Sequence, residues 1–199
     1  MKQYRIVKIH EPISWDQAET AYVNEVLWLP DAGIRMEQKI CYDDTALYIR
    51  QLAFEKDIRS VEDGILSPVC QDSCMEFFFR PEGDLRYLNF ELNPNGTLNL
   101  GLGTERKGRI RLVQADYKEV FHIKTVRNEE SWEASYQIPL SFLQLIYPGI
   151  LLSPGLVFEA NYYKCGDKTS QKHYLSWNRV CSEKPDFHRP QDFGKLLFT

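Results

Sequence analysis

The 199-residue sequence has no apolar stretch of membrane-spanning length and no long run of basic residues. A membrane-spanning helix needs about 20 consecutive apolar residues, so a helical membrane protein is excluded and no membrane partner is expected. The formal net charge of −4, with no basic run, argues against nucleic acid as the main partner. Residues 1–10 lack the apolar core of a signal peptide. We therefore expect a cytoplasmic protein, or a secreted one if a leader has been removed.

Cysteine is sparse, and the five residues are Cys41, Cys70, Cys74, Cys165 and Cys181. An odd count at low density is typical of free thiols in a reducing compartment. Cys70 and Cys74 lie four residues apart, but no close His or Cys pair completes the four ligands of a structural zinc site. The sequence therefore predicts no metal site and no cofactor.

Internal repeats, low-complexity tracts and linkers are also missing, which favours a single domain over residues 1–199. Apolar residues make up 43% of the chain and charged residues 26%, as in an ordinary folded protein. The chain is long enough to bury a substantial core, and single all-β domains often reach this size.

The chain consists mainly of short runs with β-strand composition, separated by turn signals. Strands are predicted at residues 25–29, 35–41, 46–54, 73–80, 87–92, 97–102, 120–126, 132–138, 156–164, 174–178 and 194–198. The clearest turn is residues 93–96, Asn-Pro-Asn-Gly, because proline presets φ and Asn-Gly accepts positive φ. Ser14 and Gln17 form a capping box that predicts a short helix over 14–19, and residues 139–145 form one or two helical turns. This pattern predicts a two-sheet antiparallel β-sandwich, jelly-roll-like, with one or two short helices.

Side-chain alternation divides the two central predicted strands, 73–80 and 87–92, into contrasting faces. Each strand has one wholly apolar face, and if the strands pair, these faces must coincide over the core. Glu76, Asn89 and Glu91 then gather on the opposite face. A solvent-exposed sheet face would explain each polar residue singly. The rings of Phe78, Tyr87 and Tyr163 share that face, however. Aromatic rings there must either be covered by another part of the chain or contact a ligand.

The last forty residues combine aromatic rings with Asn, Asp, Lys, His and Arg in segments 161–167, 173–178 and 185–190. This composition suits a flat, hydroxyl-rich ligand, because rings cover the C–H surface of a sugar while amides and charged groups bind its hydroxyls. Trp15, Trp28 and Trp132 are predicted to pack in the interior, as large rings usually do. For Trp177 the sequence leaves both packing and ligand contact open.

The segments 71–78, 88–96 and 161–178 resemble the family 9 carbohydrate-binding modules, most closely a stand-alone "family 9-like" bacterial branch. The similarity runs from about Trp15 to Phe198. It implies a β-sandwich that binds sugars, typically derived from xylan or cellulose, without cleaving them. Modules of this family grip a terminal sugar between two Trp rings, helped by a Glu, an Arg and amides.

Carried over by position, the resemblance assigns Glu76 as the binding carboxylate and Trp177 as one clamp ring. The other ring would lie six residues before the carboxylate, where this chain has Cys70. Either another ring (Phe78, Tyr87 or Tyr163) replaces it, or the pocket has changed ligand, or it has stopped binding sugar. Some family members bind calcium, but this sequence has no dense acidic loop for it.

The sequence thus predicts non-catalytic binding of a small saccharide or plant-polysaccharide-derived oligosaccharide, in the context of xylan and carbohydrate catabolism, with no catalytic residue. The predicted contacts are Glu76, Asn89, Glu91, Asn161, Lys164, Asp167 and Trp177. One rival is a glycoside hydrolase of xylanase type that uses Glu76 with Glu91, since paired strands place carboxyl groups at suitable separations. Another is a protein-interaction module. The sequence leaves the oligomeric state open.

Overall fold

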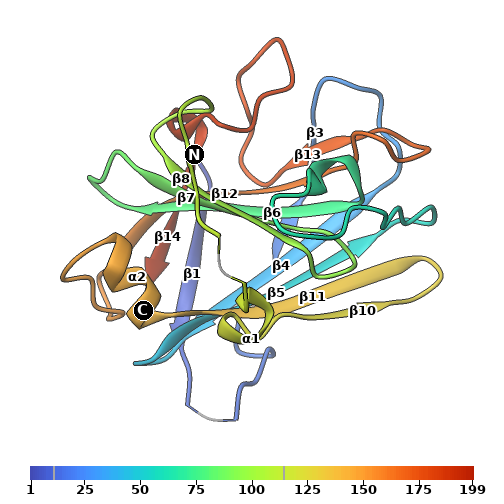
Figure 1. Cartoon of the computed structure of the whole chain (residues 1–199). Coiled ribbons are helices and arrows are strands. Elements are labelled where there is room, and N and C mark those ends of the chain that lie inside the picture. Colours follow the sequence, from blue (N-terminus) through green and yellow to red (C-terminus); the bar gives the residue numbers. More distant parts are fainter. Residues whose placement is uncertain (11, 114) are drawn as a thin grey trace.

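A computed structural model describes residues 1–10, 12–113 and 115–199 and is built mainly from β-strands (Figure 1). The strands are β1 Gln3–Lys8, β2 Ala21–Val23, β3 Glu25–Val26, β4 Arg35–Tyr42, β5 Ala46–Phe54, β6 Cys74–Pro81, β7 Tyr87–Leu92, β8 Leu98–Gly103, β9 Ile110–Arg111, β10 Lys124–Arg127, β11 Ser131–Pro139, β12 Val157–Cys165, β13 Tyr174–Ser176 and β14 Gly194–Phe198. The helices are α1 Tyr117–Val120 and α2 Leu140–Ile146, and short 3-10 turns form η1 Val69–Gln71 and η2 Pro190–Asp192. Among the described residues, no helix is both long and apolar enough to cross a membrane.

The strands form two layers, which confirms the predicted β-sandwich. One layer has the order β10-β11-β5-β4, with β2 beside β4, and the other has the order β14-β12-β6-β7-β8-β9. Strand β13 pairs with β12 and carries β3 on its outer edge. Strand β1 was not predicted from the sequence; it joins the layers by pairing in parallel with both β14 and β4.

The core lies between the layers and follows from the alternation of apolar residues along the strands. The predicted apolar faces of β6 and β7 coincide there, with Phe77 opposite Phe90 and Phe79 opposite Leu88. Trp132 is fully buried in the same cluster, as predicted. Full burial of one Phe or Leu side chain contributes about 1.5–3 kcal/mol, so each of these paired residues stabilises the fold.

Several predicted elements differ from those observed. The predicted helix at 14–19 is wrong: the segment forms turns, and the Ala18 N–H donates to the Trp15 carbonyl at 3.3 Å. Trp15 there packs beside Ile9 and Ala18 in a small separate cluster, so local packing overrides the capping signal. Residues 120–123 are not strand, because α1 precedes β10 and delivers the buried Phe121 to the core.

The predicted strand at 25–29 ends after Val26, because the backbone of Trp28 takes a left-handed conformation with φ of 56°. A non-glycine residue in this region is uncommon and needs support from its surroundings. Part of this support is a hydrogen bond in which the indole Nε1 of Trp28 donates to the Ser182 carbonyl at 2.7 Å. This contact joins the N-terminal part of the chain to the C-terminal part.

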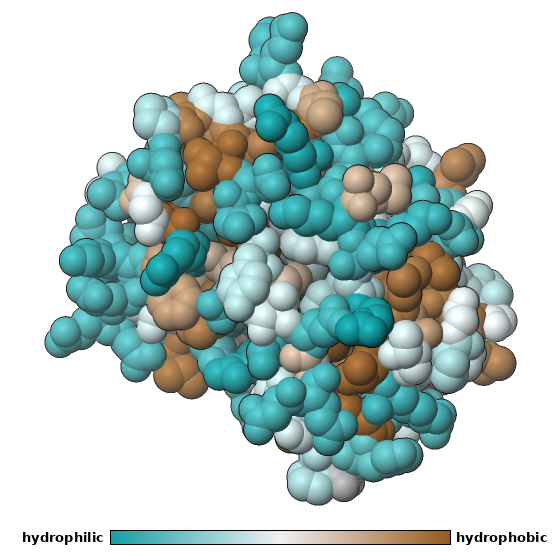
Figure 2. Space-filling model, turned by 180° about the vertical axis from the view of Figure 1, so that it is seen from behind, coloured by the Kyte–Doolittle hydropathy of each residue, from teal (hydrophilic) through white to brown (hydrophobic). Residues whose placement is uncertain are grey.

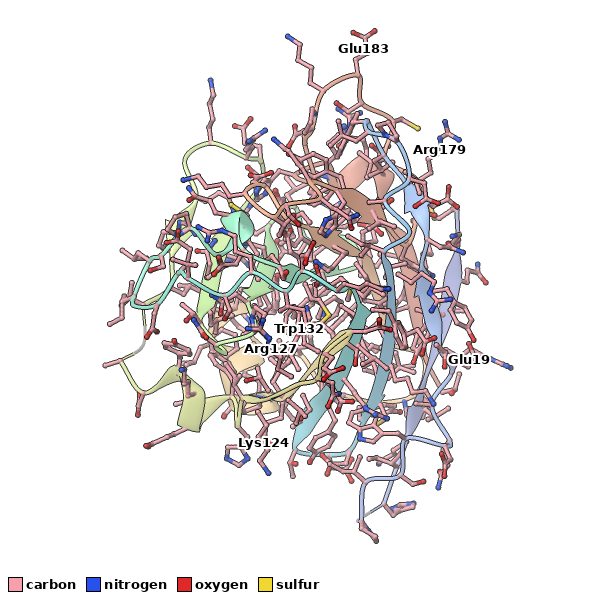
Figure 3. All side chains as sticks on the ribbon, turned by 90° about the vertical axis from the view of Figure 1, so that its right-hand side faces the viewer. Glu19, Lys124, Arg127, Trp132, Arg179 and Glu183 are labelled. Atoms are coloured by element: carbon pink, nitrogen blue, oxygen red, sulfur yellow. The ribbon has the colours of Figure 1, made fainter. Side chains whose placement is uncertain are left out.

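Residues 178–193, the closing segment, cross the outer face of β6, β7 and β12. In Figure 1 this segment is the orange-red loop at the top of the molecule, and Figure 3 shows Glu183 at its outer tip. Val180, Phe187 and Phe193 of this segment pack in one cluster with the rings of the outer face. The rings of Phe78, Tyr87 and Tyr163 are thereby covered by the chain itself, and none of the three is exposed.

Candidate functional site

A hollow of about 160 Å³ remains between the outer face of β6, β7 and β12 and the closing segment. This volume is below the roughly 300–1,000 Å³ typical of pockets for drug-sized ligands, so the hollow suits one small ring or group. Its lining comes from widely separated parts of the chain: Trp28, Cys70, Glu76, Glu91, Arg106, Cys165, Asp167, Tyr174, Pro185, Asp186, Phe187 and His188.

Two carboxyl groups form the floor, because β6 and β7 place Glu76 directly opposite Glu91. The Glu91 carboxyl accepts hydrogen bonds from the side-chain amides of Asn89 at 2.8 Å and Asn99 at 2.7 Å. Burial raises the pKa of Glu91, and burial together with the charge of Glu91 raises the pKa of Glu76 well above its usual value. A protonated Glu76 beside a hydrogen-bonded Glu91 can both donate to and accept from a ligand hydroxyl.

Thiols surround the Glu76 carboxyl on its inner side. The Sγ of Cys165 lies 3.1 Å from Glu76 Oε1, and the Sγ of Cys74 lies 3.9 Å from the same oxygen. Cys70 also lines the hollow. Burial raises the pKa of the Cys70 and Cys74 thiols, and a hydrogen bond with Cys74 together with burial raises the pKa of Cys165.

Aromatic rings form one wall of the hollow. The Trp28 ring lies 5.4 Å from Tyr174 and 5.6 Å from Phe187, measured between centroids. The hydroxyl of Tyr174 donates to Asp167 Oδ1 at 2.5 Å, which directs the Asp167 carboxylate along the same wall. Because the Trp28 indole is also anchored to the closing segment, this wall is formed before any ligand arrives.

The rim is polar and is held by the closing segment. Arg106 lies 3.7 Å from Asp186 and donates to the Pro185 carbonyl at 3.2 Å. His188 Nδ1 is 2.9 Å from the Tyr87 hydroxyl. Burial and the nearby arginines lower the pKa of His188 to about 3, so this ring is neutral at physiological pH.

The hollow brings together part of the residue set predicted from sequence. Glu76, Glu91 and Asp167 line it. Asn89 lies beside the floor, where it binds Glu91 and accepts from Arg109 Nε at 3.0 Å. The expected grouping of Glu76, Asn89 and Glu91 on one sheet face is confirmed by the strand register.

The assignment of Trp177 as a sugar-stacking ring is wrong. Its side chain is 4% exposed and packs in the core between the layers, 5.1 Å from Tyr162 between ring centroids. Its backbone N–H donates to the Tyr162 carbonyl at 2.9 Å. Trp177 therefore packs on the core-facing side of β12, whereas the hollow lies on the other side of this strand.

Asn161 and Lys164 were also predicted as ligand contacts, and this prediction is wrong for both. Asn161 uses its amide to bind the backbone of Asn178, at 2.8 Å and 2.9 Å, and so holds the start of the closing segment. Lys164 is fully buried on the core-facing side of β12, with Nζ 3.0 Å from Glu55 and 2.8 Å from His173. Alternation along β12 explains this, because Lys164 and Cys165 point to opposite faces.

Several lining residues were missed from sequence. Trp28 was expected in the interior; it packs against the cluster of the outer face and also lines the hollow. Phe187 and His188 lie in the segment 185–190, whose mixed aromatic and polar composition was the available signal. Nothing local to Trp28 marks it as a site residue, since its position depends on contact with residue 182.

The buried His173 predicts a specific pH dependence of stability. Burial and the adjacent Lys164 lower its pKa from 6.5 to about 4, so its contribution to stability is complete above pH 6.5 and is lost as pH falls toward 4. Gln can replace the neutral ring, because it can accept from Lys164 and donate to the Gln171 carbonyl, which lies 2.7 Å from His173 Nδ1.

We expect His173→Gln to lose less free energy of unfolding than the wild type between pH 7 and pH 4.5, measured by urea denaturation. His10→Gln, at an exposed position, is the matched control and should follow the wild-type curve. Equal pH dependence in wild type and His173→Gln would show that His173 is not the group responsible.

The family model for "Carbohydrate-binding family 9" matches residues 8–198. A structure from Bacteroides uniformis ATCC 8492, solved as a candidate carbohydrate-binding protein, has 28% identity and a TM-score of 0.86, covering 100% of this chain and 99% of its own. A family 9 module from Caldicellulosiruptor kristjanssonii in complex with cellotriose has 13% identity and a TM-score of 0.69, covering 99% of this chain and 93% of its own. A family 9 module from the same organism in complex with glucose has 13% identity and a TM-score of 0.70, and the match covers 100% of this chain and 96% of that module. No curated protein matches the chain.

Proposed function

The chain belongs to carbohydrate-binding family 9, and from this premise we propose that its hollow binds a small saccharide without cleaving it. The proposal rests on the presence of both carboxyl groups and aromatic rings in the lining of one small hollow. Buried carboxyl groups of Glu76 and Glu91 form the floor, and the Trp28 and Phe187 rings form a wall. A pyranose has the matching chemistry, with a C–H face for the rings and hydroxyls for the carboxyls.

The polar groups suit hydroxyl recognition because they offer both donors and acceptors. Glu91 is held by two amides, so its carboxyl is fixed in position before a ligand binds. Asp167, held by Tyr174, provides a further acceptor. Positions fixed in advance reduce the ordering cost of binding.

The small volume of the hollow favours the end of an oligosaccharide over the middle of a chain. The family relatives solved with cellotriose and with glucose make plant-polysaccharide fragments the first saccharides to test. We include xylan fragments in this class, with a role in carbohydrate catabolism. Cys70 stands where the sequence resemblance places one clamp ring, and the Trp28 wall supplies aromatic contact to the hollow instead.

A protein-docking role has less support. On the face shown in Figure 2, apolar residues form separate patches among polar ones. A docking surface is more often a large contiguous apolar patch with a polar rim.

Binding should be measured by isothermal titration calorimetry with glucose, xylose, cellotriose and xylotriose. We expect Trp28→Ala to weaken saccharide binding about tenfold, because a stacking ring contributes about 0.5–1.5 kcal/mol beyond its buried area. Tyr22→Ala is the matched control: this ring is 57% exposed on β2, in the other layer, and its loss should leave affinity unchanged. Glu76→Gln should weaken binding while leaving the aromatic wall in place.

The wild type should leave each of these oligosaccharides intact on long incubation. Hydrolysis that is abolished in Glu76→Gln would contradict non-catalytic binding and support the glycosidase alternative. Absence of binding to every sugar tested, or equal affinity in Trp28→Ala and the wild type, would contradict the assignment of this hollow.

A further inference from the structure

Three of the five cysteines converge on the floor of the hollow. Cys74 and Cys165 are direct cross-strand partners on β6 and β12, and Cys70 lies on the preceding 3-10 turn. The remaining two are elsewhere: Cys41 is buried in a separate cluster, and Cys181 is exposed in the closing segment. The clustering is therefore specific to this floor.

The cross-strand pair is completed by a carboxyl group. Cys74 and Glu76 share one face of β6 because they are two residues apart, and Cys165 faces them from β12. The Sγ atoms of Cys74 and Cys165 and a carboxylate oxygen of Glu76 all lie within 4.8 Å of one another. All three residues are buried.

This arrangement is close to the geometry of a bound metal ion. Zn–S bonds are about 2.3 Å and Zn–O bonds about 2.0–2.2 Å, so tetrahedral ligand atoms lie about 3.5–3.8 Å apart. The distance from Cys165 Sγ to Glu76 Oε1, 3.1 Å, is below this range, and the distance from Cys74 Sγ to the same oxygen, 3.9 Å, is just above it. Small side-chain rotations within the preformed strands suffice to place the three ligand atoms around one ion.

We propose that Cys74, Glu76 and Cys165 bind one thiophilic divalent cation, such as Zn²⁺, with its fourth coordination position directed toward the hollow. Two thiolates select zinc or cadmium over magnesium or calcium, which prefer oxygen ligands. Cys70 lines the same hollow but lies outside this group of three ligand atoms.

Electrostatics favours a cation at this position. The neighbouring Glu91 and Asp167 are acidic, and the ligand set itself carries up to three negative charges when deprotonated. Thiols and carboxyl groups bind metal in their deprotonated forms, so binding of the metal displaces up to three protons to solvent, and no oxidant or reductant is needed.

The test uses the full chain, stripped of metal and kept reduced, titrated with Cd²⁺ while the thiolate-to-cadmium charge-transfer absorption is followed. We expect this absorption to saturate at one equivalent in the wild type, with proton release and a single-metal adduct in native mass spectrometry. Zn²⁺ should compete for the same site.

Cys165→Ser should lower the affinity for Cd²⁺ by more than about tenfold, because even outer-shell changes cost 10–100-fold. Cys41→Ser is the matched control: it removes a buried thiol outside the floor and should leave the titration unchanged. If Cys165→Ser does not fold, Glu76→Gln removes one ligand, keeps both thiols and should also weaken binding.

The proposal is overturned if the wild type shows no one-to-one absorption, or if Cys165→Ser or Glu76→Gln binds cadmium as tightly as the wild type. An equal loss in Cys41→Ser also overturns it. No sugar is present in this titration, so its failure is distinct from a failure of saccharide binding.

Discussion

Trp177→Ala is expected to lower the free energy of unfolding by about 3–5 kcal/mol, the usual cost of deleting a large buried ring. The ring lies in the core against Tyr162 and is only 4% exposed. The Trp177 ring also packs directly against the backbone of β14. A Cβ atom at Gly194 would lie 2.5 Å from Trp177 Cζ3, so only glycine allows this close approach. The measurement is urea denaturation followed by circular dichroism.

Trp28→Ala is the informative comparison, because the same residue type is removed from a partly exposed wall. It should cost less stability than Trp177→Ala and should reduce saccharide affinity. A Trp177→Ala protein that keeps wild-type stability but loses sugar affinity would contradict its placement in the core. It would instead restore the clamp role predicted from the sequence resemblance.

Lys164→Met is expected to lower the free energy of unfolding by about 3–5 kcal/mol, because removing one partner of a buried ion pair leaves an uncompensated charge. Lys164 is fully buried and its Nζ lies 3.0 Å from Glu55 Oε1. The same Glu55 oxygen accepts from Trp132 Nε1 at 2.7 Å, and this bond alone cannot replace the lysine charge. Stability should again be measured by urea denaturation at pH 7.

The double variant Lys164→Met/Glu55→Gln should recover part of the lost free energy of unfolding, because it also removes the unpaired carboxylate charge of Glu55. Lys195→Met is the control: Lys195 forms an exposed pair with Glu82 at 2.6 Å, and its loss should leave stability nearly unchanged because solvent screens such pairs. Unchanged stability in Lys164→Met together with weaker sugar binding would return this lysine to the ligand contacts.

Local pattern was sufficient for much of the sheet structure. The bounds predicted for residues 46–54, 87–92 and 194–198 coincide with β5, β7 and β14. These segments lie between clear turn signals and are rich in β-forming residues, and both properties can be read from neighbours in sequence. The same alternation correctly placed Glu76 and Glu91 on one face, because a two-residue period leaves no other choice once β6 and β7 pair.

The β class, the central strand pairing and the acidic floor follow from side-chain period and turn chemistry, which are local properties of the chain. Which rings are covered, and which of them face a hollow, depends on contacts between distant segments. Trp177 and Trp28 exchange their expected roles because the closing segment covers one face of β12 while the second layer covers the other. Likewise Cys74 gains Cys165 as a neighbour only through strand pairing, since contacts between residues 91 positions apart depend on the register of the folded sheet.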